Sequence, residues 1–487
     1  MSEASIDPTP SSPEEFDPVK AKDLIRTLLV QNHKQRVLIE LAKMTGQEFD
    51  LIRLLEIIIR KSTEVVDADR SAVFLVDRKH QRLWTIVAEG LENESIITVP
   101  LTAGIVGAVV TTGKQVIIDD CYADPRFDRS VDLRTGYHTR NIAATPLISS
   151  SGKVLGVLEV INKKDGPFTH DDSDFISAFA AAAANHVETA TLYREMETLF
   201  NGFIDTVAAA VDERDPCTAG HSRRVKMYSR AMGDEINNAK EGPLSTIRFT
   251  PDDLRQLEIA ALMHDVGKVG VRDAVLNKRN RLTDEALHVV IQRIDLILSK
   301  KKLAHVIEGS PLDPVEELEV QDAIQFIQRV TAAGFLPEQD AKRLWEIRAR
   351  GWLDDCEYEH LAVQRGNLTA SEWEHMQSHV TKSQQLLSRI PWPESLKRVP
   401  EIAYCHHEKL NGKGYPRGLN AEQIPLESQI VTVADIYDAL TAHDRPYKPP
   451  MPHDRAASIL REQAGQHFLN NDVVELFLGQ RLYLVKD

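Results

Sequence analysis

The sequence predicts a multidomain protein in which an α+β domain is followed by a long helical passage and a second domain. The chain has 487 residues, more than one hydrophobic core normally serves, which indicates two or three domains. Between residues 71 and 162, short strand-like runs alternate with turns, and helical segments stand mostly at the ends. This pattern is typical of an antiparallel sheet backed by helices. From residue 171 to 215 the sequence then predicts one long helical passage.

The composition excludes several classes of protein. A net charge of −15 argues against a protein that coats nucleic acid, so we expect no DNA partner. The four cysteines are widely scattered and form no CxxC pair, which indicates a reducing cytoplasm. No apolar run approaches the roughly 20 residues needed to span a bilayer, so we expect no membrane partner. The predicted location is cytoplasmic.

Three stretches outside the predicted domains have patterns of their own. Residues 1–18 are acidic and rich in Pro and Ser, which predicts a disordered tail rather than a signal peptide. Residues 19–49 have helical spacing and either join a dimer or lie on their own domain. Residues 189–206 predict a connecting helix, because its apolar residues are spaced four, three and four apart as in a heptad seam. The seam residues are Leu192, Met196, Leu199 and Phe203. We expect this seam to pair in a homodimer, with packing inside one domain as the alternative.

Residues 260–270 organise the chemistry of the second half. Ile259, Leu262 and Met263 give this stretch the spacing of a buried helix, yet its end carries His264, Asp265 and Lys268 into the interior. Burying charge is costly unless the charge is paired or bound to a metal. The partners that the rest of the chain offers are His221, His379, His406, His407 and Asp435. Imidazole and carboxylate ligands suit Fe, Mn, Zn or Ni, and one carboxylate can bridge two ions.

Three motifs in the first half carry a family resemblance. They are Gly104-Ile105-Val106-Gly107, the run from Thr135 to Asn141, and Asn162-Lys163 followed by Phe168 and Asp172. Together they resemble a GAF domain, over residues 50–188, of the cyclic-nucleotide-binding kind found in phosphodiesterases and adenylyl cyclases. Ser173 stands where the family usually has its final Glu.

The GAF resemblance implies a ligand site for cAMP or cGMP as an effector. The cyclic phosphate would lie at a helix N-terminus, on the backbone of Ile105 and Val106. The side chains at the matching pocket positions are Glu89, Asp132, Thr135, Thr139 and Glu159. The alternative is a GAF fold that binds another ligand or only dimerises.

The second half carries the run from His406 to Leu419, with His406-His407-Glu408 and Gly414-Tyr415-Pro416, in addition to His264-Asp265. This combination resembles the HD-GYP family, phosphodiesterases that open bacterial cyclic dinucleotides. The resemblance implies an all-α domain over residues 207–487 and two metal ions bridged by Asp265. One ion would also take His221, His264 and Asp435, and the other His379, His406 and His407. Iron or manganese suits these ligands.

The same resemblance assigns the residues around the metals. Lys268 would contact a phosphate oxygen or protonate the leaving alkoxide, which makes it catalytic together with Asp265. Arg445 and Lys448 match positions that contact phosphate, and Gly414 and Tyr415 form a turn beside the substrate or, alternatively, a merely structural loop. Glu408 is expected to orient a ligand histidine.

A repeated helix start predicts an insertion. Leu-Thr occurs at Leu282 and again at Leu368; eleven residues further on lie Arg293 and His379, respectively. Only the second copy places a histidine in register, so we expect a helical insertion over residues 291–364.

These observations predict a signalling enzyme in which a GAF sensor regulates an HD-GYP phosphodiesterase. The expected reaction is hydrolysis of cyclic di-GMP to pGpG, and further to GMP. The alternatives are 3′,3′-cGAMP as substrate and, from another class, a non-catalytic receptor for cyclic dinucleotides. The receptor is disfavoured because all seven metal positions carry ligand residues.

Overall fold

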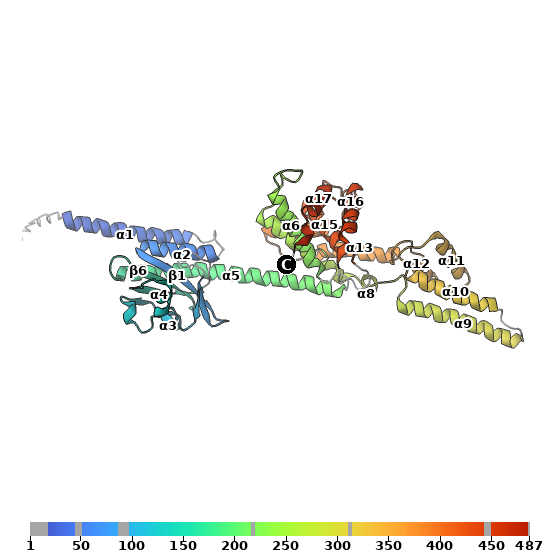
Figure 1. Ribbon diagram of the computed structural model, residues 1–487, viewed down its shortest axis with the longest axis horizontal. Coiled ribbons are helices and arrows are strands. Elements are labelled where there is room, and N and C mark those ends of the chain that lie inside the picture. The colour runs from blue at the N-terminus through green and yellow to red at the C-terminus, as the bar shows by residue number, and fades with distance from the viewer. Residues whose placement is uncertain are drawn as a thin grey trace, which may run out of the picture. The chain divides into compact units, whose positions relative to one another are not determined.

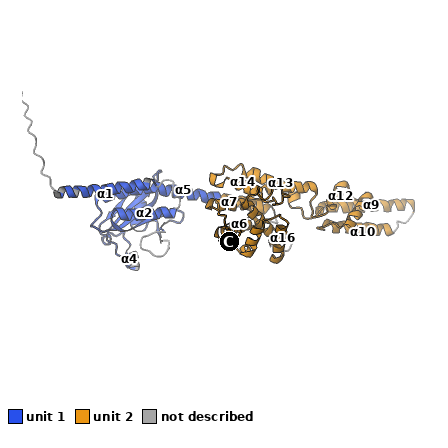
Figure 2. Ribbon diagram, turned by 90° about the horizontal axis from the view of Figure 1, so that it is seen from above, with its two compact units in different colours: residues 1–200 blue, residues 201–487 orange. Residues whose placement is uncertain are grey.

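The computed structural model describes residues 18–43, 51–85, 97–215, 220–309, 314–442 and 450–485. The chain divides into two compact units, unit 1 (residues 1–200) and unit 2 (residues 201–487), which Figure 2 colours separately. The predicted tail, Glu89, Arg445 and Lys448 lie outside the described residues. Among the helices that are described, none is long and apolar enough to cross a membrane.

Unit 1 is built around a six-stranded sheet in the order β3-β2-β1-β6-β5-β4, with all neighbours antiparallel (Figure 1). The strands are β1 (Ala68–Asp77), β2 (Arg82–Thr85), β3 (Ile97–Pro100), β4 (Val116–Ile118), β5 (Ile142–Ile148) and β6 (Val154–Lys163). The helices are α1 (Pro18–Lys43), α2 (Leu51–Val65), α3 (Gly104–Thr112), α4 (Arg129–Thr135) and the first part of α5 (His170–Arg214), with a short 3₁₀ turn, η1 (Cys121–Ala123). The predicted antiparallel sheet backed by helices is confirmed.

The two faces of the sheet are buried against different helices. Alternate residues of a strand point to opposite faces, and on β6 Leu158 and Val160 enter a core shared with α1, α2 and α5. Val157 enters a second core together with Ile105 and Val106 of α3. The α3 face is therefore the one on which the predicted ligand site falls.

α5 is a single helix of 45 residues that begins in unit 1 and ends in unit 2. Phe175 and Phe179 near its start are buried in the core of unit 1, and Ile204 and Ala208 near its end are buried too. Between them lies the predicted heptad seam, and Leu192, Met196, Leu199 and Phe203 are all exposed.

Unit 2 is built from helices and short 3₁₀ turns. The helices are α6 (His221–Asn238), α7 (Pro251–Met263), α8 (Asp273–Leu276), α9 (Asp284–Glu308), α10 (Pro314–Thr331), α11 (Glu338–Ala349), α12 (Asp355–Leu361), α13 (Ala370–Leu387), α14 (Val399–Tyr404), α15 (Leu426–Thr441), α16 (His453–Gly465) and α17 (Asn471–Gly479). The 3₁₀ turns are η2 (Val266–Gly270), η3 (Glu394–Leu396) and η4 (Leu482–Leu484). The mainly helical character expected of the second half is confirmed.

Helices α9 to α12 have an apolar core of their own, formed by residues from Leu282 to Leu361 (Figure 1). Both predicted helix starts are N-caps: the hydroxyl of Thr283 accepts from Ala286 N at the start of α9, and that of Thr369 accepts from Glu372 N at the start of α13. The ammonium of Lys278 donates to the Glu372 carboxylate at 2.7 Å. This contact joins the chain before helices α9 to α12 (the extra helices) to α13, the helix that follows them.

Candidate metal centre

The seven predicted metal ligands come from five separate parts of unit 2. His221 begins α6, His264 and Asp265 directly follow α7, His379 lies in α13, His406 and His407 follow α14, and Asp435 lies in α15. The local sequence explains the end of α7. Thr250 and Asp253 form a capping box at its start, Leu257, Ala260 and Ala261 are buried, and the buried face leads directly to His264.

Gly267 allows the turn after His264 to approach α13. A Cβ atom at this position would lie 2.0 Å from the backbone oxygen of His379, so a side chain would push the two segments apart. The Gly267 amide donates to Ser383 Oγ of α13 at 2.8 Å. The His-Asp pair and His379, more than a hundred residues apart, are thereby held against each other.

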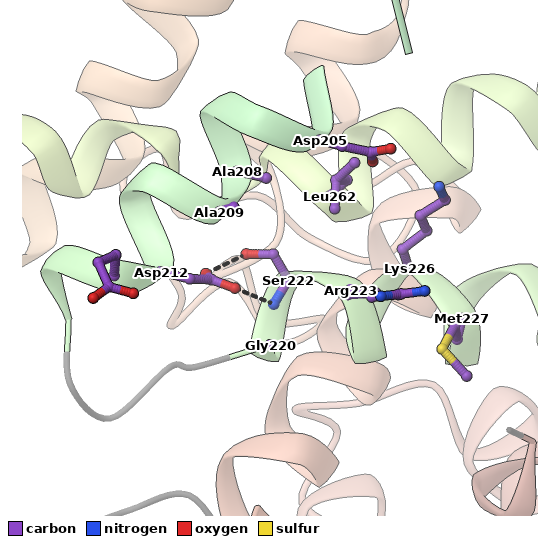
Figure 3. A pocket seen from close by; sticks show the side chains of 11 residues that line it. Asp205, Ala208, Ala209, Asp212, Gly220, Ser222, Arg223, Lys226, Met227 and Leu262 are labelled. Atoms are coloured by element: carbon purple, nitrogen blue, oxygen red, sulfur yellow. Dashed lines mark hydrogen bonds between the residues drawn. The ribbon is translucent and has the colours of Figure 1, made fainter. Parts of the chain in front are cut away.

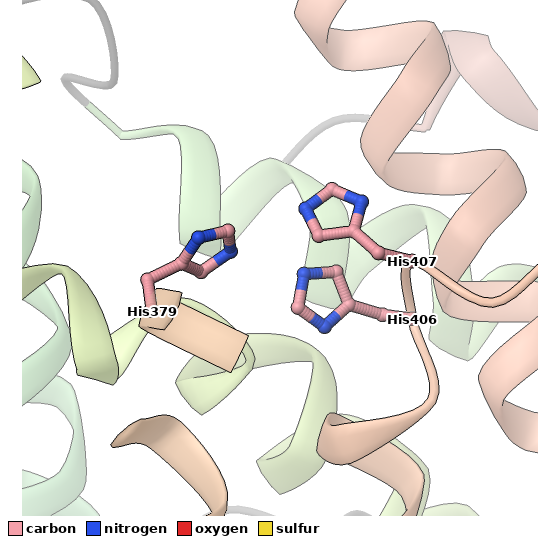
Figure 4. A group of neighbouring side chains, drawn as sticks. All are labelled: His379, His406 and His407. Atoms are coloured by element: carbon pink, nitrogen blue, oxygen red, sulfur yellow. The ribbon is translucent and has the colours of Figure 1, made fainter. Parts of the chain in front are cut away.

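Two carboxylates face the histidines. Asp265 places Oδ1 3.2 Å from His379 Nε2 and Oδ2 3.4 Å from His264 Nε2. Asp435 places Oδ1 3.2 Å from His221 Nε2 and 3.9 Å from His264 Nε2. Ligand atoms of the group His379, His406 and His407 lie within 4.8 Å of one another, and Figure 4 shows these three rings together. The ligand atoms also lie within 4.8 Å of one another in two further groups, namely His221, His264 and Asp265, and His264, His406 and Asp435.

Three of the histidines point a buried nitrogen without a hydrogen-bond partner into this cluster. His264, His379 and His406 each donate Nδ1–H to a backbone carbonyl three residues earlier, at 2.7 Å. Their Nε2 atoms are buried and make no hydrogen bond. An unpaired buried polar atom is costly, and a hydrogen bond at Nδ1 leaves the Nε2 lone pair available to a cation. The donor set therefore fits divalent metal ions.

The charge states also suit metal binding. Burial and the neighbouring His407 hold the pKa of His406 well below its usual value, and burial together with His379 lowers the pKa of His407 to about 4. Although burial alone would raise the pKa of Asp265, Lys268 and His264 hold it well below its usual value. Neutral imidazoles and ionised carboxylates are the forms that bind metals.

Burial alone would lower the pKa of His264, but Asp265 raises it above its usual value. His221 differs from His406 and His407 in the same direction. Burial alone would lower its pKa, but hydrogen bonds to Asp435 and Asp438 raise it to about 10. A cation bound at Nε2 would therefore displace a proton from this ring.

Lys268 lies beside the cluster between two carboxylates. Its Nζ donates to Asp265 Oδ2 and to Asp215 Oδ2, at 2.9 Å in both cases. Burial alone would lower the pKa of Lys268, but these carboxylates raise it above its usual value. A protonated ammonium therefore stands next to the Asp265 carboxylate.

The predicted ligand residues of unit 1 lie in the first turn of α3, on β6, and in and after α4. Ile105 and Val106 occupy the first turn of α3, where backbone N–H groups have no partner within the helix. Glu159 projects from β6 on the same face of the sheet as Val157, and burial raises its pKa to about 7. The Asp132 carboxylate accepts from Thr139 N at 2.7 Å and Thr139 Oγ1 at 2.8 Å.

Comparisons with known proteins agree with this division of the chain. Residues 50–187 match the GAF domain family, and residues 218–327 and 357–470 each match an HD domain family. The chain combines a GAF domain with an HD-family region. The resemblance to both families is thus confirmed, and the proposed metal centre draws ligands from both HD matches.

Three curated relatives are similar to parts of the chain. The 3′3′-cGAMP-specific phosphodiesterase 3 of Vibrio cholerae is 27% identical over 252 residues, 52% of this chain and 33% of that protein. The cyclic di-GMP phosphodiesterase of the same organism is 28% identical over 285 residues, 58% of this chain and 40% of that protein. The probable 3′,5′-cyclic phosphodiesterase pde-5 of Caenorhabditis elegans is 28% identical over 254 residues, 49% of this chain and 33% of that protein. The matches thus span less than half the length of these relatives.

The loop after His406 and His407 corrects one expectation. Glu408 does not orient a histidine; its carboxylate accepts from the backbone amides of Arg417 at 2.7 Å and Leu419 at 2.9 Å. His264, His379 and His406 donate to backbone carbonyls instead, and His221 donates to Asp438. The buried Glu408 therefore holds the loop that contains Gly414 and Tyr415. A Cβ at Gly414 would lie 2.3 Å from Lys409 N, which explains the glycine.

Two acidic residues contact the proposed metal centre although the sequence analysis did not predict these contacts. Asp438, one turn beyond Asp435 on α15, accepts a hydrogen bond of 2.8 Å from His221 Nδ1. Asp215 pairs with Lys268, as described above. The i, i+3 spacing of Asp435 and Asp438 on one helix was the only signal in the sequence that could have pointed to the first. Of the predicted GAF pocket, Glu89 and the side chain of Thr135 lie outside what the structure describes.

Proposed function

We propose that the HD region is a metal-dependent phosphodiesterase that hydrolyses cyclic di-GMP to pGpG and further to GMP. The observation that carries this proposal is the convergence of three buried Nε2 atoms without a hydrogen bond, those of His264, His379 and His406, on the ionised carboxylates of Asp265 and Asp435. His221, His264, Asp265 and Asp435 would hold one ion, and Asp265, His379, His406 and His407 the other. Bound iron or manganese would supply an activated water and neutralise phosphate charge.

The residues of the chain account for the proton that the reaction needs. Hydrolysis adds water to phosphorus, breaks the bond from phosphorus to the ribose 3′-oxygen and delivers a proton to that oxygen. Lys268 holds a proton beside Asp265 and is raised in pKa by Asp265 and Asp215. It therefore serves to stabilise charge on the phosphate oxygens or to protonate the leaving oxygen. Arg445 and Lys448 are proposed to contact the phosphates.

A second candidate substrate is 3′,3′-cGAMP. One relative is named for 3′3′-cGAMP and another for cyclic di-GMP, at 27% and 28% identity, so similarity does not separate the two dinucleotides. The direct test is to incubate purified, anaerobically metal-loaded protein with each dinucleotide and to identify products by chromatography. Binding of both without any product would instead support the receptor alternative.

The GAF domain is proposed to bind cAMP or cGMP and to regulate the HD region through α5 in a homodimer. Support for the ligand comes from the first turn of α3 beside Glu159 and from the buried Thr139. Support for the route comes from the contacts of the last turns of α5 within unit 2. Asp212 accepts hydrogen bonds from Ser222, at 2.7 Å from its hydroxyl and 3.3 Å from its amide. Figure 3 draws both bonds among the residues that line a pocket of about 600 Å³.

The end of α5 also contacts the turn that carries Lys268. The Arg214 guanidinium donates to the backbone oxygen of Val271 at 2.8 Å and to Asp273 Oδ1 at 2.8 Å, and it also contacts the oxygen of Val269. Ser222 follows the proposed ligand His221 directly. A shift of α5 would therefore move both a metal ligand and the catalytic lysine.

A further inference from the structure

The proposed metal centre is accessible from one side. Of the seven proposed ligands, His407 and Asp435 are partly exposed, whereas His221, His264, Asp265, His379 and His406 are buried. A phosphodiester must reach the donor atoms where they meet solvent. The groups that surround His407 therefore line the way in.

Aromatic rings continue outward from His407. The ring of Tyr415 stacks on that of His407, with centroids 4.8 Å apart and planes 30° apart. The indole of Trp373 meets Tyr415 edge to face, with centroids 6.5 Å apart and planes 75° apart. Trp373 projects from the first turn of α13, the helix that also carries His379. The row of rings thus leads from the histidine cluster to Trp373.

Trp373 is 49% exposed, although an indole gains stability from burial. The start of α13 does not require this side chain, because the capping box there is formed by Thr369 and Glu372. Tyr415, in contrast, is fixed by the hydrogen bond from its amide to His407 O at 3.2 Å and by the stacking of its ring. A large aromatic surface that stays open beside a site entrance indicates ligand contact.

We infer that Trp373 is the residue on which a purine base of the substrate stacks. This inference rests on the proposed function and adds the base-binding side of the same site. A cyclic dinucleotide carries flat bases joined through ribose to the phosphates, so a base extends away from the metals when a phosphate is bound. One face of Tyr415 is covered by His407, which leaves Trp373 as the open ring in this row. Stacking is tolerant of base identity, so Trp373 would bind a base without distinguishing guanine from adenine.

The test compares Trp373→Ala, Trp373→Phe and a matched control, Trp345→Ala. Trp345 lies in α11, among the helices that have an apolar core of their own, and is 59% exposed, so its removal takes away the same kind of surface from a helix that holds no proposed ligand. For metal-loaded proteins we would measure metal content, kcat and KM for cyclic di-GMP, and the Kd of the linear dinucleotide pGpG by calorimetry. Inorganic phosphate, as a competitor of pGpG, serves as the probe without a base.

Loss of a stacked base should weaken binding and spare the chemistry. We expect Trp373→Ala to raise KM and the Kd of pGpG about 10-fold or more, with metal content, kcat and competition by phosphate unchanged. Trp373→Phe should restore most of the binding, and Trp345→Ala should behave as wild type.

Three outcomes would overturn the inference. Unchanged KM and Kd in Trp373→Ala would show that no base stacks there. A loss of metal or kcat would show that Trp373 only supports Tyr415. If the wild-type protein neither binds nor cleaves dinucleotides, both the proposed function and this inference are wrong. If it binds them through Trp373 but does not cleave them, only the proposed phosphodiesterase activity is wrong.

Discussion

His221 and Asp438 form a buried pair in which Nδ1 of the imidazole donates a 2.8 Å hydrogen bond to Oδ2 of the carboxylate. The same carboxylate accepts from Nε of Arg224 at 2.6 Å. The other ring nitrogen of His221 faces Asp435. Such a carboxylate fixes the tautomer and orientation of a metal-binding histidine, so Asp438 supports the proposed centre without entering it.

Replacing Asp438 by Asn should therefore lower metal affinity about 10- to 100-fold, because the amide no longer holds the ring or its proton. Metal content after dialysis against graded chelator would measure this. Asp454→Asn, at an exposed position in α16, is the control that removes a carboxylate elsewhere. Equal affinity in both variants would contradict the role of Asp438.

Asp265 should be the ligand whose loss matters most. Its two oxygens face His379 and His264, which belong to different proposed ions. Asp265→Ala should therefore abolish both metal binding and turnover, as measured by elemental analysis and product chromatography. An active Asp265→Ala protein would exclude the bridging arrangement.

Lys268 tests chemistry separately from metal binding. Lys268→Ala should lower kcat about 10²-fold or more with metals retained, because the ammonium acts on charge in the transition state. Lys382→Ala is a matched control, since Lys382 contacts Gly270 O of the same turn at 2.6 Å. A rise in KM alone would make Lys268 a ground-state phosphate contact.

The register of the insertion can be tested with three alanine variants. His379 lies 3.2 Å from Asp265, whereas Arg293 donates to Glu357 of α12 at 2.8 Å within the extra helices. His379→Ala should reduce metal content, and Arg293→Ala and His305→Ala should leave it at the wild-type level. The reverse result would make the helix that follows Leu282 the ligand helix.

The sequence predicted those parts of the protein that depend on local pattern. The short, largely apolar run that contains Val157 and Leu158 identified β6, and the Leu-Thr starts at Thr283 and Thr369 are both helix caps. The strand order could not be predicted in this way, because β1 pairs with β6 across more than eighty residues. Such pairing depends on tertiary packing and leaves no periodic signal.

Dependence on tertiary packing also explains which contacts around the proposed metal centre the sequence did not predict. Asp438 meets His221 only because α15 packs on α6, and Trp373 meets Tyr415 only through the fold of the loop. Glu408 was expected beside a histidine because it follows His407, but the turn directs its carboxylate to the amides of Arg417 and Leu419. Neighbours in sequence are poor guides to contacts where the backbone turns.

The last prediction concerns coupling along α5. A ligand in the GAF domain can alter turnover only if it favours one of two arrangements of a connecting element. α5 is the described helix that begins in unit 1 and ends in unit 2, and its exposed seam from Leu192 to Phe203 would pair across a dimer. A small rotation or shift of the paired helices would reach Ser222 and the Lys268 turn through Asp212 and Arg214.

We therefore expect cAMP or cGMP to change turnover of the full-length protein by about 5- to 150-fold, the range that a typical coupling free energy gives. Thr139→Ala should abolish the response and spare basal activity. Inserting four residues after Glu197 should also abolish it, because the insertion rotates the seam relative to the GAF domain, while nucleotide binding by calorimetry persists. Arg214→Ala should weaken the response at the other end of α5. If neither nucleotide binds at millimolar concentration, the effector assignment is wrong, and the metal centre remains testable through Asp265.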